Sequence, residues 1–344
     1  MKIQNNLFDQ IEDAQIQNES NLYLAFNHEN ITQLIKPASQ GMLHGFPPNE
    51  LINVRYIVSE YINGGELFDY IAYTGKFSEQ VARYFFNQFM NGLSYLHTAG
   101  YVHRDIKVEN LMLDSNCILK FIDFGFTARS QGDNNDGLFS DFKGTESYLA
   151  PEVRPGQQYD GIKVDIFAAG IVLFIMLLGH PPFYKANAQD PFYRYFRKNR
   201  PEDFWSVIQH NYSYNQGFVS DEFKQLFNKM VDFKPANRPN IQMIMQSSWL
   251  KGPIPKDDEI KDEFKIRLKK LEEKRIKEED EQKQKNHTII HDACNNLGIG
   301  DIQIQELDNK IMKKFKKIPG KFTYKGLKMD PKLILSNIIN YVTQ

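Results

Sequence analysis

The sequence predicts an α+β fold with two lobes, a small β-rich lobe followed by a larger helical lobe. Two segments near the start, 32–36 (TQLIK) and 54–61 (VRYIVSEY), have the apolar and β-branched residues typical of strands. Beyond residue 153 the apolar pattern is mostly helical. The apolar stretch 166–179 is too short to span a bilayer and indicates a buried core helix. A few strands followed by a long helical part indicate two lobes.

The middle of the chain combines one helix, one strand and several turns. A helix is expected over 77–96, with Ser78 as its candidate N-cap. The segment 117–127 (CILKFIDFGFT) has a strand pattern that runs into Asp-Phe-Gly. A turn-rich segment, 130–137 (SQGDNNDG), then leads to 144–153 (GTESYLAPEV).

A highly charged helix is expected after a change of composition near residue 253. Residues 256–285 are rich in charges of both signs. Ile260, Phe264, Leu268 and Leu271 fall on one stripe at helical spacing. This pattern predicts an exposed amphipathic helix.

These patterns predict three parts: a folded domain at 1–253, a charged helical linker at 254–285 and a small basic module at 286–344. From 310 to 332 there are nine lysines and a single acidic residue, and 330–342 has the pattern of an amphipathic helix. A basic module of this kind suits contact with an anionic membrane, with calmodulin or with the chain's own folded domain. A solvated face of a small domain is the favoured interpretation, and these contacts are the alternatives to it.

Composition excludes several classes of protein. The 344 residues are 41% hydrophobic and 13% aromatic, which is typical of a globular chain. A net charge of −1 argues against nonspecific nucleic-acid binding. With Cys117 and Cys294 as the only cysteines, neither a zinc cluster nor a disulfide framework is expected. Residues 1–13 are polar and lack the apolar core of a signal peptide, so a cytoplasmic location is expected.

A dense set of polar residues lies between apolar positions at 101–113 (YVHRDIKVENLML). Phosphoryl transfer requires metal ions on the phosphates, a positive charge on the developing anion and an aspartate that orients the attacking hydroxyl. Asp105 suits the aspartate role, and Lys107 suits the positive charge. Asn110 and the later Asp123 provide neutral and charged oxygen ligands for Mg²⁺.

Several ordered motifs resemble those of protein kinases. His103–Asp105 with Asn110 resembles the catalytic loop, and Asp123–Gly125 resembles the metal-binding turn. Ala150–Glu152 resembles the end of the activation segment, and Arg238 matches the arginine that pairs with its glutamate. The resemblance covers roughly residues 2–253 and implies a two-lobed kinase fold that uses ATP and Mg²⁺ and acts on protein substrates.

The motifs are most similar to those of serine/threonine kinases. Lys107 stands two residues after Asp105, which is the serine/threonine pattern. The segment 60–71 (EYINGGELFDYI) resembles the calcium/calmodulin-dependent and energy-sensing group. A nucleotide-binding module of another fold is disfavoured because no Walker A sequence is present.

The resemblance also implies a set of nucleotide-binding residues. Glu60 to Ile62 correspond to the hinge that hydrogen-bonds adenine, and Met112 belongs to the same set. Glu66 lies where basophilic kinases hold ribose or a substrate arginine. This position predicts a preference for basic peptides. A solvated glutamate at a helix N-terminus is the alternative for Glu66.

The first residues depart from the kinase pattern. Glu19 lies nine residues before His28 of HENI, where the family has its αC glutamate, and Lys2 lies 17 residues before Glu19. The resemblance therefore implies a phosphate-anchoring Lys2–Glu19 pair, with a stray N-terminal lysine as the alternative. No Gly-x-Gly-x-x-Gly precedes Lys2. Either a shortened active kinase or a pseudokinase-like scaffold is expected, with an incomplete small lobe and weak Mg-ATP binding.

A fixed carboxylate stands where related kinases carry an activating threonine. The family threonine lies eleven residues before the glutamate of Ala-Pro-Glu, and here that position is Asp141, with Ser140 beside it. Arg104 would bind the phosphate in the family. Asp141 is therefore predicted to pair with Arg104 without modification. The alternative is a solvated loop aspartate.

Overall fold

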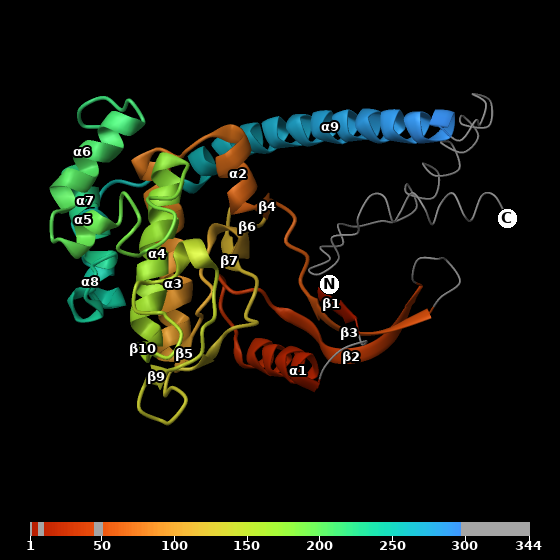
Figure 1. The fold of residues 1–344 in the computed structure, drawn as a ribbon, viewed down its shortest axis with the longest axis horizontal. Helices are drawn as coiled ribbons and strands as arrows, with labels where there is room; N and C mark the ends of the chain where they lie inside the picture. Colours follow the sequence, from red (N-terminus) through yellow and green to blue (C-terminus); the bar gives the residue numbers. More distant parts are fainter. Residues whose placement is uncertain (1, 6–9, 45–50, 297–344) are drawn as a thin grey trace. The chain divides into compact units, whose positions relative to one another are not determined.

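The computed structural model describes residues 2–5, 10–44 and 51–296 (Figure 1). The predicted lysine-rich segment 310–332 and the helix at 330–342 lie outside these residues. Residues 5–271 form one compact unit. All residues of the candidate site described below belong to this unit, with the exception of Lys2.

The N-terminal part contains a helix and a β-hairpin. Its elements are β1 (Lys2–Asn5), α1 (Gln10–Ala25), β2 (Leu34–His44) and β3 (Leu51–Ser59). β2 and β3 pair antiparallel, from Leu34 opposite Ser59 to His44 opposite Leu51. The register shifts around Pro37, which has no N–H to donate to the ladder. Both predicted strands are confirmed, although β2 continues eight residues beyond the expected end at 36.

The larger part is mainly helical. Its helices are α2 (Leu67–Thr74), α3 (Glu79–Thr98), α4 (Gly161–Leu178), α5 (Arg194–Arg197), α6 (Pro201–Asn211), α7 (Asp221–Met230), α8 (Ile241–Met245) and α9 (Asp257–Asn296). Its short strands are β4 (Gly65–Glu66), β5 (Tyr101–Val102), β6 (Leu111–Leu113), β7 (Leu119–Phe121), β8 (Ala128–Arg129), β9 (Leu138–Phe139) and β10 (Tyr159–Asp160). A small β-rich part followed by a helical part confirms the predicted fold class.

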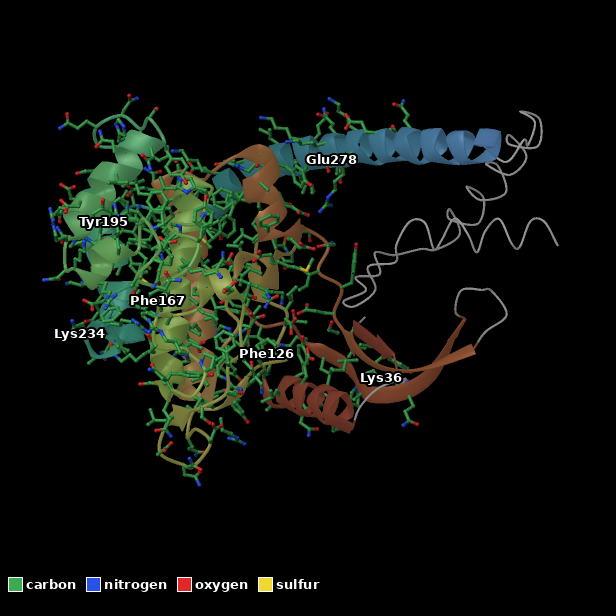
Figure 2. All side chains as sticks on the ribbon, in the orientation of Figure 1. Lys36, Phe126, Phe167, Tyr195, Lys234 and Glu278 are labelled. Carbon is green, nitrogen blue, oxygen red and sulfur yellow. The ribbon has the colours of Figure 1, made fainter. Side chains whose placement is uncertain are left out.

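Two predicted core helices are present, and the predicted cap Ser78 is confirmed; α3 lies two residues later than 77–96, and α4 begins five residues before 166. Ser78 caps α3 by accepting a hydrogen bond from the Val81 N–H at 3.3 Å. Asp160 caps α4, which ends at Gly179 in the left-handed region (φ 80°). Among the described residues, only α4 is long and apolar enough to cross a membrane, and it is mostly buried within the protein. Figure 2 shows Phe167 of α4 among densely packed side chains.

The charged helix α9 is confirmed, but its apolar stripe is not exposed to solvent. Ile260, Phe264 and Leu271 are buried in the main hydrophobic core, and Leu268 packs against that core half-buried. An amphipathic pattern shows that one face is apolar, but it does not show what covers this face. Here aromatic side chains of the helical part cover it.

Candidate functional site

A buried aspartate of α4 holds the loop that follows β5. The Asp165 carboxylate accepts the backbone N–H groups of His103 and Arg104, both at 2.8 Å. Its Oδ2 also lies 2.9 Å from His97 Nε2 at the end of α3. Arg104 adopts a left-handed conformation (φ 63°), a strained backbone for a non-glycine residue. The three contacts to Asp165 fix this loop conformation, which sets the directions of the side chains after it.

His103 supports the loop from inside the core. Its ring lies 5.6 Å from the ring of Phe121 and 5.5 Å from that of Phe124, measured between centroids. Burial lowers the pKa of His103, so the imidazole is neutral near pH 7. Nδ1 accepts the Asp105 N–H at 3.3 Å. His103 therefore positions Asp105 through the backbone.

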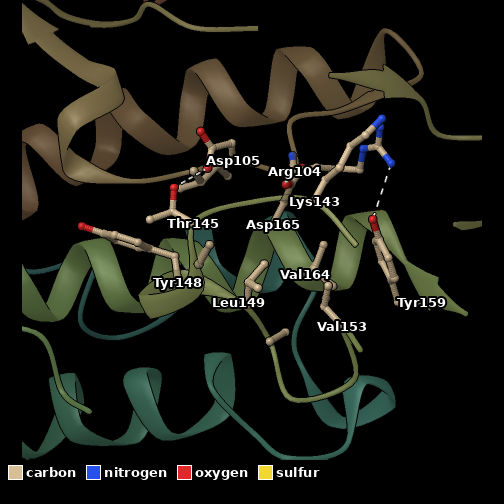
Figure 3. Close-up of a pocket in the computed structure, with 13 residues that line it drawn as sticks. Arg104, Asp105, Lys143, Thr145, Tyr148, Leu149, Val153, Tyr159, Val164 and Asp165 are labelled. Carbon is tan, nitrogen blue, oxygen red and sulfur yellow. Dashed lines mark hydrogen bonds between the residues drawn. The ribbon is translucent and has the colours of Figure 1, made fainter. Parts of the chain in front are cut away.

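Asp105 lies at the centre of a hydrogen-bonded cluster. Its Oδ2 pairs with Lys107 Nζ at 2.7 Å, and its Oδ1 accepts the Thr145 hydroxyl at 2.7 Å (Figure 3). Lys107 Nζ also donates to Thr145 Oγ1 at 2.8 Å. The Asn110 amide donates to the Asp105 carbonyl oxygen at 2.9 Å and to Oδ2 at 3.1 Å. A carboxylate, an ammonium group and an aliphatic hydroxyl are thus in mutual contact.

Thr145 was not among the residues predicted from the sequence. It lies 40 residues after Asp105, and its partners become visible only in the folded chain. The sequence showed only that a threonine stands five residues before Ala150, within the segment 144–153 that leads to Ala-Pro-Glu. A threonine at one position does not reveal its partners, so this signal could not have identified the contact.

A backbone hydrogen bond holds Asn110 next to the residue that precedes Asp123. The Ile122 N–H donates to the Asn110 carbonyl oxygen at 3.1 Å, so Asp123 follows directly after this contact. Asp123 Oδ1 accepts the Gly125 N–H at 3.0 Å, which stabilises the turn. Since the Asn110 amide nitrogen donates to Asp105, its side-chain oxygen is the atom available to a cation.

No three His, Cys, Asp or Glu side chains of the described residues lie close enough together to hold a metal ion. Proteins usually bind Mg²⁺ through one or two carboxylates plus the phosphates of a substrate, so such a site does not need a cluster of three side chains. Asn110 and Asp123 are the candidate donors, one through an amide oxygen and one through a carboxylate.

A second cluster surrounds Arg104 and Asp141. Arg104 Nη1 lies 2.7 Å from Asp141 Oδ1, and its Nε donates to the Phe126 carbonyl at 2.9 Å. The Tyr159 hydroxyl also donates to Asp141 Oδ1 at 2.9 Å, and Lys143 Nζ lies 2.9 Å from Oδ2. Burial acts to raise the pKa of Asp141, but Lys143, Arg104 and Tyr159 together lower it below its usual 3.8.

Ser140 is not part of the cluster around Arg104. Its hydroxyl donates to Asp133 Oδ2 at 2.9 Å, and the side chain is exposed. The two neighbouring candidates, Ser140 and Asp141, therefore face different partners.

The Glu152–Arg238 pair is bidentate, with Arg238 buried and Glu152 half-buried. Arg238 Nη1 and Nη2 lie 2.6 and 2.8 Å from the two carboxylate oxygens of Glu152. Arg238 also donates to the carbonyl oxygens of Asp232 and Lys163, each at 3.0 Å. Its guanidinium group lies 4.8 Å from the centroid of the Phe167 ring. This pair attaches the segment after Thr145 to the helical core.

A pocket lies beneath the Asp105 cluster, between the segment 143–153 and α4 (Figure 3). Its lining residues are Arg104, Asp105, Ile106, Lys143, Thr145, Tyr148, Leu149, Ala150, Val153, Tyr159, Val164, Asp165 and Ala168. Both clusters contribute residues to this pocket, so Asp105 and Arg104 face a common space.

Glu60, directly after β3, contacts Gln33 and Lys120, which the sequence pattern did not predict. Its Oε1 accepts the Gln33 N–H at 2.9 Å and lies 3.0 Å from Nζ of Lys120. The Glu60 N–H donates to the Gln33 carbonyl at 2.9 Å. Ile62, two residues on, is buried. The segment 60–62 is therefore fixed at its start by a buried lysine from β7.

Glu66 and Met112 are direct partners in a small sheet. β4 pairs with β6, with Glu66 opposite Met112, and β6 pairs with β7, with Met112 opposite Lys120. Because side chains of directly opposed residues share a face, these three residues form one row. Glu66 is also the N-cap residue of α2, but its side chain makes no capping hydrogen bond.

Glu19 is buried on α1 and lies near the Asp-Phe-Gly turn. The Tyr23 hydroxyl donates to the Ile122 carbonyl at 2.5 Å, which docks α1 beside that turn. Burial raises the pKa of Tyr23, and the charges of Glu19 and Asp123 raise it further, so both carboxylates lie close to Tyr23. Lys2 belongs to β1, but its side chain lies outside the described part of the structure.

Comparison with known proteins places the clusters in a family context. Residues 1–250 match the family model of the protein kinase domain. CBL-interacting protein kinase 15 of Oryza sativa subsp. japonica is 37% identical over 243 residues, 70% of this chain and 50% of the relative. CBL-interacting serine/threonine-protein kinase 19 of Arabidopsis thaliana is 35% identical over 239 residues, 69% of this chain and 44% of the relative. The chain spans about half the length of these relatives.

Proposed function

The chain belongs to the protein kinase family, and from this premise we propose that it transfers the γ-phosphoryl group of ATP to serine and threonine hydroxyls of proteins. The observation that carries the proposal is the cluster of Asp105, Lys107 and Thr145. An aliphatic hydroxyl lies 2.7 Å from the Asp105 carboxylate, which is the contact that a substrate serine would need. The relatives are named as CBL-interacting kinases, which also supports protein partners for this chain.

Each residue of the cluster has a proposed role in the transfer. Asp105 orients the attacking hydroxyl and accepts its proton. Lys107 stabilises the charge that develops on the transferred phosphoryl group. Asn110 and Asp123 hold Mg²⁺, which when bound neutralises charge on the phosphate oxygens and orients them for in-line attack.

The nucleotide is proposed to bind along the segment that follows β3. The backbone of Glu60 and Ile62 is proposed to hydrogen-bond adenine, while the Glu60 side chain is paired with Lys120. Met112 packs against the base, and Glu66 lies near the ribose. Glu19, buried on α1, is proposed to face the phosphates, and its pairing with Lys2 stays a prediction from the sequence.

A preference for basic residues in the peptide substrate is proposed from Glu66 and Glu109. Glu109 is exposed beside the Asp105 cluster, and its Oε2 accepts the Tyr148 hydroxyl at 3.2 Å. Since Tyr148 lines the pocket described above, Glu109 lies close to that pocket, and we propose that a peptide substrate passes beside it. Two carboxylates near this path would favour arginine upstream of the target hydroxyl.

We expect the chain, incubated with Mg-ATP and a peptide library, to phosphorylate serine and threonine in basic peptides. Mass spectrometry of the products identifies the residues and their context. Glu66→Ala should raise KM for basic peptides about tenfold, since a charge-assisted contact contributes ~1.5 kcal/mol. Glu202→Ala, on α6, is the matched control. Phosphotyrosine products would contradict the proposed acceptor, and a proline-directed profile would contradict the basic preference.

Asp141 is proposed to keep the segment after Asp123 ordered without phosphorylation. We expect phosphatase treatment to leave activity unchanged and Asp141→Asn to lower kcat about tenfold, through loss of ~1.5 kcal/mol of charge-assisted bonding to Arg104. Asp136→Asn, in the same loop, is the control. A loss of activity after dephosphorylation would instead identify a phosphorylated residue, with Ser140 the first candidate, as the switch.

The same carboxylate makes stability depend on pH. The folded-state pKa of Asp141 lies below the ordinary value of 3.8, so its contribution to stability is complete above that value. The contribution is lost as the pH falls through the lowered pKa. The acid-induced loss of stability should therefore be smaller for Asp141→Asn than for the wild type.

A further inference from the structure

The matched kinase domain ends at residue 250, and α9 begins after it. The first turns of α9 nevertheless pack into the hydrophobic core of the helical part. The centroid of the Phe264 ring lies 4.8 Å from that of Phe85, 5.1 Å from that of Tyr70 and 5.5 Å from that of Phe77. Phe264 is 3% exposed. Residues 257–271, here called the α9 anchor, are therefore an integral part of the core of the compact unit.

Arg267 attaches the α9 anchor to the C-terminal end of α2. Its Nη1 donates to Thr74 Oγ1 at 2.8 Å and to the Gly75 carbonyl oxygen at 3.0 Å. Its Nε pairs with Glu263 at 2.8 Å, one turn earlier on α9. The last carbonyls of a helix lack partners within the helix, so an arginine at this end is stabilising. Polar and aromatic contacts thus hold α2 from the same side.

Tyr70 connects the α9 anchor to the proposed adenine-binding segment. One side of its ring packs on Phe264, and its hydroxyl donates to the Gly64 carbonyl oxygen at 2.6 Å. Gly64 lies directly against β6, because a Cβ there would clash with the Leu113 carbonyl oxygen. The backbone just after 60–62 is therefore fixed between Tyr70 and β6.

We propose that the α9 anchor is a positioning element for nucleotide binding. By packing on Tyr70 it fixes the Tyr70 hydroxyl against Gly64, and this contact holds the backbone of 60–62 in the geometry that receives adenine. Release of the anchor therefore weakens nucleotide binding without altering Asp105 or Lys107. The nucleotide part of this inference rests on the proposed function, whereas the mechanical link from Phe264 to residues 60–66 does not.

Phe264→Leu and Tyr70→Phe in the 344-residue chain test the link. We expect each to raise the Kd for Mg-ADP, measured by calorimetry, about three- to tenfold. Each should also speed hydrogen exchange of the amides of residues 60–66 in the absence of nucleotide. Because both changes act on one contact path, the double variant should show no more than the larger single effect.

Two control variants distinguish a specific effect of the Phe264–Tyr70–Gly64 contacts from a general loss of stability. Phe227→Leu, in the aromatic core of α7, should lower Tm but leave the Mg-ADP Kd and the exchange at 60–66 unchanged. Ile266→Ala, on the exposed face of α9, should change neither. Unchanged exchange at 60–66 in Phe264→Leu, or additive effects in the double variant, would overturn the inference. If the wild type binds no Mg-ADP while Phe264→Leu still speeds this exchange, the proposed function fails and the mechanical link stands.

Discussion

Asp105→Asn is expected to lower kcat for peptide phosphorylation by about 10²–10⁴-fold, the usual contribution of a positioned general base. The substitution preserves the size of the side chain and its capacity to accept from Thr145, but it removes the charge that pairs with Lys107. An amide oxygen is a poor proton acceptor, so the attacking hydroxyl loses its base. Phosphopeptide formation is measured by mass spectrometry at saturating Mg-ATP.

The affinity for Mg-ADP distinguishes a catalytic role from a structural one. Because Asp105 is assigned to the hydroxyl and not to the nucleotide, the Kd for Mg-ADP should be unchanged in Asp105→Asn. Asp203→Asn, on α6, is the matched control and should retain full activity. Retention of more than about a tenth of the wild-type kcat by Asp105→Asn would remove Asp105 from the proposed mechanism.

Arg238→Leu is expected to destabilise the protein by about 3–5 kcal/mol, because it leaves the Glu152 carboxylate half-buried without its partner. The variant also removes donors from the carbonyl oxygens of Asp232 and Lys163. Urea unfolding monitored by circular dichroism measures the free energy of unfolding. The midpoint should shift at constant slope if only the stability of the folded state changes.

Two further variants test whether the loss of stability comes from leaving a charge unpaired where it is shielded from solvent. The double variant Arg238→Leu/Glu152→Leu should recover part of the lost stability, because removing both charges costs less than leaving one unpaired. Lys185→Leu breaks an ion pair with Glu146 whose side chains are more than half exposed. Such surface pairs contribute about 0–1 kcal/mol, so Lys185→Leu should be nearly neutral. A double variant no more stable than Arg238→Leu would contradict the explanation.

The order of the kinase motifs could be predicted from the sequence because their chemistry depends on short spacings. Asp105, Lys107 and Asn110 lie within six residues, so their side chains are close in any loop of that length, and the contacts to Asp165 then set their directions. The buried helix α4 and the charged helix α9 were also predictable, since apolar length and helical periodicity are local properties. The predicted strand at 54–61 agreed with β3 to within three residues at its start and two at its end.

Other parts of the site were decided by packing between distant segments. Thr145 reaches Asp105 across 40 residues, and Lys120 reaches Glu60 across 60. Neither contact follows from a local pattern, because a threonine or a lysine at one position is compatible with many partners.

By itself, the sequence determined the fold class, the family motifs and the candidate residues for phosphoryl transfer, because these depend on residue type and short spacing. Only the tertiary structure decided which face of α9 is covered and how Phe264 and Tyr70 connect that helix to Gly64. The physical reason is that burial and side-chain contact depend on the arrangement of whole elements. An amphipathic stripe needs a covering surface, and several surfaces satisfy the same pattern until the chain has folded.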